Sequence, residues 1–179
     1  MAEERTEITM AKLIAFYSRA DENYFGGAMK YVRIGNTEKA ADKIAELTGG
    51  ELFKIEQKVP YAAEYRACVE EARRDKQDNA RPELAALPGN FDRYDEIFLG
   101  YPNYCGTMPM AVYTFLESFD FTGKKIYPFC THEGSGLSNT ERDIRGAAKG
   151  AVVGKGLAIH GSSVDDAEPM LKRWIEECK

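Results

Sequence analysis

The chain has 179 residues, of which 44% are hydrophobic and 30% charged, a balance that is typical of one globular domain with a substantial core. Its formal net charge is −5. Proteins that neutralise phosphates need a basic face, so we expect neither nucleic acid nor an acidic membrane as a partner. No apolar run reaches the length of a transmembrane helix.

The cysteines and the N-terminus bear on the compartment. Cys68, Cys105, Cys130 and Cys178 stand apart in the sequence, and no pair has C-x-x-C spacing. This pattern predicts reduced thiols in a cytoplasmic protein and no metal site. Residues 1–10 are charged and lack the apolar segment of a signal peptide. We therefore predict a disordered tail over 1–10 and a single domain over 11–179.

Five short apolar runs recur along the chain, at residues 13–17, 52–55, 97–99, 126–130 and 157–159. Runs that are apolar on both faces suit parallel strands with helices on both sides of the sheet. We therefore expect each run to form one buried strand.

Helical patterns separate these runs. Asn36 and Thr37 can cap the first helix, and a highly charged pattern around residues 65–72 predicts a second. Thr107 can cap a third helix that has Pro109 in its first turn. Strands that alternate with helices predict a doubly wound α/β sheet.

Two more helices complete the pattern. Ser138 and Glu141 have the S-x-x-E spacing of a capping box for the fourth helix. The last helix places Leu171, Trp174 and Ile175 on one side. Ligands of doubly wound sheets bind outside the carboxyl ends of the strands, so the residues directly after each apolar run are the candidate site.

The loop after the first run can bind a phosphate. Ser18 and Arg19 follow the strand, and Gly35 stands before the predicted helix, where exposed N–H groups and the helix dipole favour an anion. An ordinary helix cap is the alternative interpretation. The 16 residues 19–34 separate the two halves of this motif.

The loops after the third and fourth runs have different characters. Residues 100–107 contain two tyrosines that could stack on a planar ligand or simply cover the end of the sheet. Residues 131–138 are rich in glycine and hydrogen-bond donors. They do not fit a dinucleotide motif, because Asn139 stands where a third glycine is needed. His132 beside Glu133 makes no metal chelate, and Cys105 has no partner base, so we predict no catalytic residue.

Together the three loops fit a flavin mononucleotide (FMN) better than other common ligands. The second loop reads Y-P-N-Y-C-G-T-M-P over 101–109, and the third reads T-H-E-G-S-G over 131–136. In these motifs the chain resembles the flavodoxin family, and most of all the bacterial flavodoxin-like flavoproteins with Y-P-N-W-W-G-T-M-P and T-H-E-G-S-G loops. The resemblance runs from about Lys12 to Trp174.

The resemblance implies a flavodoxin-like three-layer fold with five parallel strands in the order 2-1-3-4-5, and a bound FMN that cycles among three redox states. We also predict that the backbone near Gly106 bonds to the flavin N5 atom, since glycine tolerates the change in φ that reduction would require. The cofactor-binding residues that the motifs and the resemblance indicate are Ser18, Arg19, Ile34, Gly35, Asn36, Thr37, Pro102, Asn103, Tyr104, Cys105, Gly106, Thr107, Thr131, His132, Glu133, Gly134, Ser135 and Gly136.

The chain departs from the family pattern at three places. Ile34 replaces a hydroxyl residue of the phosphate loop, and Tyr104-Cys105 stands where a tryptophan pair is common. The third loop lacks the tyrosine that shields the second flavin face in typical flavodoxins, which leaves room over that face.

We therefore expect an FMN-dependent electron carrier that serves redox partner proteins and is a monomer or a weak homodimer. The alternative is an NAD(P)H-dependent FMN reductase of quinones or similar small acceptors. The absence of a nicotinamide motif favours the carrier. A scaffold of the same fold without a cofactor is a weaker third interpretation.

The insertion at 19–34 has a pattern of its own. Asn23-Tyr24-Phe25 and the segment 28–32 flank Gly26-Gly27, which is a two-residue hairpin signal. We predict a β-hairpin after the first strand. Its aromatic residues could cover the FMN, contact a second subunit, or pack on the base of the hairpin itself.

Overall fold

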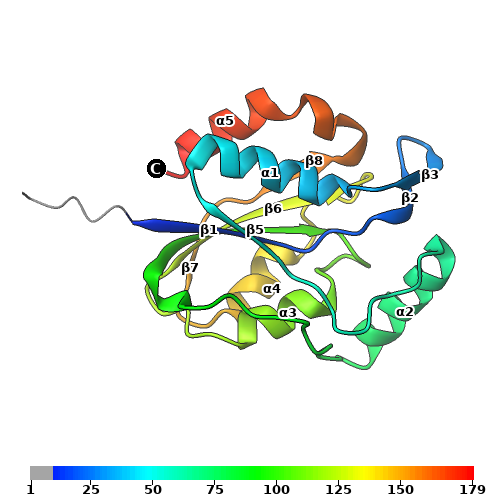
Figure 1. Ribbon diagram of the computed structural model, residues 1–179, viewed down its shortest axis with the longest axis horizontal. Helices are drawn as coiled ribbons and strands as arrows, with labels where there is room; N and C mark the ends of the chain where they lie inside the picture. The colour runs from blue at the N-terminus through cyan, green and yellow to red at the C-terminus, as the bar shows by residue number, and fades with distance from the viewer. Residues whose placement is uncertain (1–9) are drawn as a thin grey trace, which may run out of the picture.

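The computed structural model describes residues 10–179, so nearly all of the predicted tail lies outside the described residues. The main sheet is entirely parallel, with the order β4-β1-β5-β6-β7 and with β8 also beside β6. Its strands are β1 (Ala11–Phe16), β4 (Glu51–Lys54), β5 (Tyr94–Pro102), β6 (Lys125–His132), β7 (Val152–Val153) and β8 (Leu157–His160). Counted as five strand positions, this is the predicted order 2-1-3-4-5 (Figure 1).

The fifth strand position is divided between two short pieces. β7 pairs with the start of β6 and β8 with its end. Between them, the indole N–H of Trp174 donates to the carbonyl of Lys155 at 2.9 Å. A Cβ at Gly154 would lie 2.8 Å from the ring of Tyr127. The sequence predicted only the second piece, because β7 is a two-residue strand with one exposed side chain.

Helices cover both faces of the sheet (Figure 1). α1 (Asn36–Thr48) and α5 (Glu168–Glu177) lie on one face, and α3 (Met110–Glu117) and α4 (Thr140–Ala147) lie on the other. Phe98, Phe129 and Trp174 pack in the first core, and Leu99 and Phe115 pack in the second. The three-layer doubly wound fold is therefore confirmed. None of the helices in residues 10–179 has the length and apolar character needed to cross a lipid bilayer.

The predicted caps of α1 and α3 are wrong. The N-cap of α1 is Gly35, which offers no side chain, and the hydroxyl of Ser18 accepts the N–H of Glu38 at 3.1 Å instead. The N-cap of α3 is Pro109, so the helix starts later than predicted. Thr107 uses its hydroxyl elsewhere, as described below.

The predicted capping box of α4 is also wrong. Its N-cap is Asn139, and Ser138 has a φ of +49°. Glu141 accepts the N–H of Gly156 at 2.6 Å and so ties α4 to the loop before β8. The Glu141 carboxylate therefore binds a residue 15 positions away and does not cap the start of the helix.

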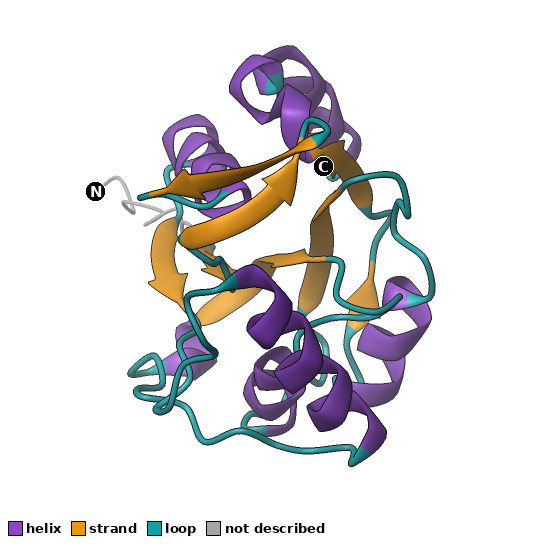
Figure 2. Cartoon of the chain, turned by 90° about the vertical axis from the view of Figure 1, so that its right-hand side faces the viewer, coloured by secondary structure: helices purple, strands orange, loops and turns teal. Residues whose placement is uncertain are grey.

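The predicted hairpin is confirmed. β2 (Asp21–Phe25) and β3 (Ala28–Val32) form a separate antiparallel sheet. Gly26 and Gly27 turn the chain with φ of +61° and +79°, a conformation that favours glycine. Figure 2 turns the end of the molecule that carries the hairpin toward the viewer.

Helix α2 (Tyr65–Gln77) lies at this same end (Figure 1). Only Cys68 and Ala72 are buried in it. The irregular segment after α2 leads through the short 3-10 helix η1 (Phe91–Arg93) into β5. A second 3-10 helix, η2 (Gly161–Asp166), follows β8. Neither α2 nor the hairpin is packed into the main core, and both lie at the end of the molecule where the carboxyl edge of the sheet is found.

Candidate functional site

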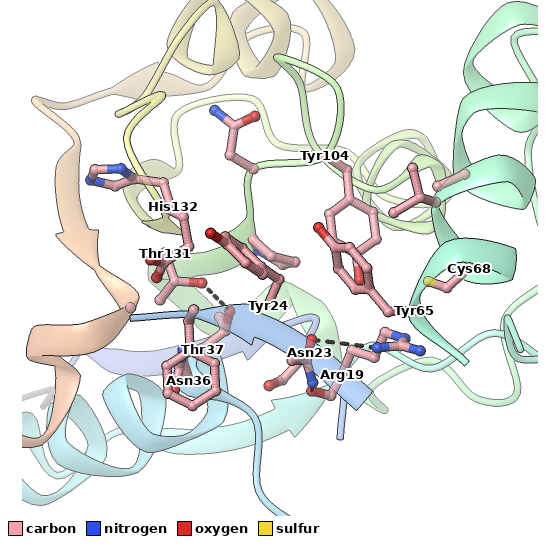
Figure 3. Close-up of a pocket in the computed structure, with 18 of the residues that line it drawn as sticks. Arg19, Asn23, Tyr24, Asn36, Thr37, Tyr65, Cys68, Tyr104, Thr131 and His132 are labelled. Atoms are coloured by element: carbon pink, nitrogen blue, oxygen red, sulfur yellow. Dashed lines mark hydrogen bonds between the residues drawn. The ribbon is translucent and has the colours of Figure 1, made fainter. Parts of the chain in front are cut away.

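A cavity of about 320 Å³ lies at the carboxyl edge of the sheet, where the three predicted loops, the hairpin and α2 meet (Figure 3). This volume is within the range of small-molecule sites. Twelve of the eighteen predicted residues line it: Ser18, Arg19, Asn36, Thr37, Pro102, Asn103, Tyr104, Cys105, Thr131, His132, Glu133 and Ser135.

The cavity lining does not include the other six, which are Ile34, Gly35, Gly106, Thr107, Gly134 and Gly136. Ile34 is 47% exposed. The N–H of Gly106 is bound to the amide oxygen of Asn103 at 3.0 Å, so it is not free to meet a ligand in this conformation. The hydroxyl of Thr107 lies 2.7 Å from that of Tyr113 and donates to Asp143 at 2.8 Å.

The start of α1 has unused hydrogen-bonding capacity. Within residues 10–179, the N–H groups of Asn36 and Thr37 donate to no other group. The side-chain oxygen of Asn36 is buried and has no partner there either. Both residues line the cavity. Two free donors at the positive end of a 13-residue helix suit an anion, and the orphaned oxygen suits a hydroxyl beside it.

Gly35 brings the two halves of the interrupted motif together. A Cβ there would lie 2.5 Å from the carbonyl oxygen of Arg19 and would also overlap the hydroxyl of Ser18. Such contacts are too short for any residue but glycine. The ends of the 19–34 insertion therefore meet at the base of the cavity.

Arg19 faces away from the predicted anion position. Its guanidinium donates to the carbonyls of Ala62 and Ala63 at 2.8 and 2.7 Å, and also to the carbonyl of Glu22. The residue lines the cavity, but its charge joins the hairpin to the segment before α2. Its donors are committed to carbonyls, which leaves the α1 N–H groups as the main anion donors.

Three hydrogen bonds fix the loops relative to each other. The hydroxyls of Thr37 and Thr131 lie 2.7 Å apart in a buried contact that joins α1 to β6 (Figure 3). The amide nitrogen of Asn103 donates to the carbonyl of Gly136 at 3.0 Å and to the hydroxyl of Ser138 at 2.9 Å. The second and third loops are thus one hydrogen-bonded unit.

Aromatic rings form the walls. Tyr24 from the hairpin and Tyr65 from α2 face each other, with 6.4 Å between ring centroids (Figure 3). Tyr104 contacts Tyr17 edge to face, at 6.0 Å between centroids. Aromatic faces at these positions can stack on a planar ligand.

Nine lining residues were not among the predicted cofactor-binding residues: Asn23, Tyr24, Phe25, Val32, Tyr65, Cys68, Val69, Ala72 and Gly161. The hairpin pattern marked the first four as a unit but did not fix the direction in which it folds. Nothing in the sequence of α2 distinguishes a helix beside the cavity from one on the sheet. Gly161 could be predicted only because it directly follows a strand, at the edge where ligands of such sheets bind.

Apart from Arg19 and Glu133, the titratable side chains that line the cavity are uncharged near neutral pH. Burial raises the pKa of Tyr104 well above its usual value, and the neighbouring Tyr17 and Cys68 raise it further. Burial also raises the pKa of the Cys68 thiol. Burial and the nearby His160 lower the pKa of His132. Neutral aromatic side chains beside an anion-binding helix start match a ligand with an uncharged ring system and a phosphate.

Comparison with known proteins agrees with this geometry. The family model of the flavodoxins matches residues 28–178. A candidate flavoprotein from Bacteroides uniformis ATCC 8492 is 28% identical, with a TM-score of 0.73 over 93% of this chain and 98% of the other. No curated protein sequence matches the chain.

Two more distant structures share the fold. One is a candidate flavoprotein from Bacteroides eggerthii DSM 20697, which is 22% identical, with a TM-score of 0.67 over 90% of this chain and 98% of the other. The second is a flavoprotein from Lactobacillus acidophilus NCFM in complex with FMN. It is 23% identical, with a TM-score of 0.62 over 88% of this chain and 97% of the other.

Proposed function

We propose that this chain, which belongs to the flavodoxin family, binds FMN in the cavity and carries electrons between redox partner proteins. The observation that carries the proposal is the start of α1, where two free N–H groups and the orphaned side-chain oxygen belong to Asn36 and Thr37, which line a cavity walled by tyrosines. When bound there, FMN supplies the capacity to accept and pass on one or two electrons.

Two groups of residues would hold such a ligand, one at its phosphate end and one at its flavin ring. We assign the phosphate to the N–H groups of Asn36 and Thr37 with the nearby hydroxyl of Ser18, and a ribityl hydroxyl to the side-chain oxygen of Asn36. We assign the flavin ring to the space beside Tyr24 and Tyr65. The FMN-bound relative from Lactobacillus acidophilus supports the cofactor assignment.

The size of the cavity supports a carrier over a reductase. A volume of about 320 Å³ is at the lower end of the range for one ligand. A reductase must also place a nicotinamide or a quinone over one flavin face, and the hairpin and α2 wall the cavity with Tyr24 and Tyr65. An electron carrier needs only an accessible flavin edge, so a cavity with room for one ligand favours it.

Reconstitution with FMN tests the proposal. Protein mixed with FMN and desalted should retain a flavin absorption spectrum, and it should pass electrons to a one-electron acceptor such as cytochrome c after anaerobic reduction. NADH or NADPH should give no steady turnover with a panel of quinones. Loss of all flavin on desalting would contradict FMN binding, whereas rapid nicotinamide oxidation would replace the carrier with the reductase.

A further inference from the structure

The hairpin closes one side of the cavity although it pairs with no strand of the main sheet. Its base is well attached. The Glu22 carboxylate accepts the N–H of Tyr65 at 3.1 Å, and the N–H of Glu22 donates to the carbonyl of Ala63 at 3.3 Å. With the Arg19 contacts, these bonds join the base of the hairpin to the start of α2.

Within residues 10–179, the tip of the hairpin (residues 25–28) makes one hydrogen bond to another element. The N–H of Gly26 donates to the carboxylate of Glu133 at 3.0 Å. Glu133 belongs to the third loop, and its neighbour His132 lies on the opposite side of the cavity from Arg19 and Tyr65 (Figure 3). The hairpin is therefore held at its base by the start of α2 and at its tip by Glu133, and Tyr24 and Phe25 between these two points form one wall of the cavity.

The carboxylate of Glu133 is held in place from behind. Gly161 backs directly onto it, and a Cβ at that position would overlap the second carboxylate oxygen. The ring nitrogen Nδ1 of His160 lies 3.8 Å from the oxygen that accepts from Gly26. The side chain of Glu133 is only 23% exposed. The bond to Gly26 is exposed to solvent, but a carboxylate that accepts a backbone N–H still makes a stronger bond than a neutral acceptor does.

We propose that Glu133 is a positioning residue that latches the hairpin over the cavity and so controls how fast FMN enters and leaves. The ligand in this statement rests on the proposed function. Glu133 acts through the hairpin: when the bond to Gly26 breaks, Tyr24 and Phe25 move off the cavity together. An open wall speeds entry and exit alike, so the rate constants change more than the dissociation constant does.

The test compares Glu133→Ala with Glu133→Gln, because the glutamine amide oxygen still accepts the N–H of Gly26. Stopped-flow flavin fluorescence gives both FMN rate constants. Hydrogen exchange of residues 21–32, measured without FMN, reports on the latch itself. For the alanine variant we expect both rate constants to rise roughly 5- to 10-fold and the hairpin amides to exchange faster, as loss of a charge-assisted hydrogen bond predicts. The glutamine variant should recover most of the difference.

Two controls separate the latch from other roles. Glu83→Ala should match the parent protein, because Glu83 pairs with Lys58 outside the cavity. In a variant whose residues 21–31 are replaced by a short linker, Glu133→Ala should have no further effect on either rate constant. An effect of the same size there would show that Glu133 contacts the cofactor directly, and would overturn the proposal.

The latch and the cofactor assignment fail separately. Unchanged hydrogen exchange in the hairpin of Glu133→Ala would overturn the latch, as would a glutamine variant no better than the alanine variant. Failure of the parent protein to bind FMN would contradict the proposed function. Because hydrogen exchange needs no FMN, it would still decide whether Glu133 holds the hairpin.

Discussion

Gly35 is the residue at which the first strand, the insertion and α1 meet. We expect Gly35→Ala to lower the free energy of unfolding by about 1–3 kcal/mol, because a Cβ would lie 2.5 Å from the carbonyl oxygen of Arg19, a backbone atom that cannot rotate away. The same displacement moves the hydroxyl of Ser18 and should weaken FMN binding. Urea unfolding and flavin fluorescence measure the two effects.

The matched control for this prediction is Gly146→Ala in α4, where a Cβ would meet no atom within 4 Å. Replacing a glycine inside a helix by alanine should raise the free energy of unfolding by about 0.5–1 kcal/mol. If Gly35→Ala were as stable as the parent protein, the close approach at the base of the cavity would not be needed.

The four cysteines differ in solvent exposure, so their reaction rates can report on the cavity. Cys105 is exposed and lines the cavity, whereas Cys68 and Cys130 are buried. Burial raises the pKa of Cys130 to about 12 and that of Cys178 to about 11, so both remain thiols at pH 8. We expect iodoacetamide to modify Cys105 first and bound FMN to slow that reaction. Peptide mass mapping over time would show a different order if another thiol were more accessible.

At the scale of elements, the predictions from sequence succeeded where packing and local pattern agree. The three central apolar runs become strands that are buried on both faces, whereas the edge strand β4 leaves Leu52 48% exposed. Gly26-Gly27 turns the hairpin because only glycine readily takes two successive positive φ values. The caps failed where distant groups competed for the same atoms. Ser18 satisfies α1 from 20 residues away, and Glu141 is drawn to Gly156.

The candidate site shows the same division. The three loops were predictable because the strand-end rule places them at one edge. The direction in which the hairpin and α2 fold depends on contacts far apart in sequence, such as Gly26 with Glu133 and Glu22 with Tyr65. The local pattern therefore left three possible roles open for Tyr24, and it gave no sign that Tyr65 lines the cavity.

Helix α2 is the element whose stability depends most on its ends. It buries only Cys68 and Ala72, whereas the shorter α3 buries five residues. The carboxylate of Glu64 accepts the N–H groups of Arg66 and Ala67 at 3.1 and 2.7 Å. We expect Glu64→Ala to destabilise this helix by about 1 kcal/mol.

Hydrogen exchange is the measurement for α2. In the parent protein its amides should exchange before those of α3, because little apolar surface must be exposed to open it. Glu64→Ala should speed exchange in α2 roughly 5-fold, as a loss of about 1 kcal/mol requires. Glu70→Ala, an exposed position within the same helix, is the control. Equal exchange in both variants would mean that the cap adds nothing.

At the scale of the whole molecule, the cofactor should stabilise the fold through both ends of the cavity. A ligand at 100 times its dissociation constant adds about 2.7 kcal/mol to the free energy of unfolding. For a chain of this length that corresponds to a rise in Tm of about 5–10 °C. We therefore expect FMN to raise the melting temperature that far-UV circular dichroism records.

Riboflavin separates the two ends, because it has the same ring and ribityl chain but no phosphate. At equal concentration it should raise Tm less than FMN does, since the N–H groups of Asn36 and Thr37 then have no anion to bind. The advantage of FMN should shrink in Gly35→Ala, where the start of α1 is displaced. Equal Tm shifts with the two flavins would show that the start of α1 does not bind the phosphate and that the aromatic walls alone hold the ligand.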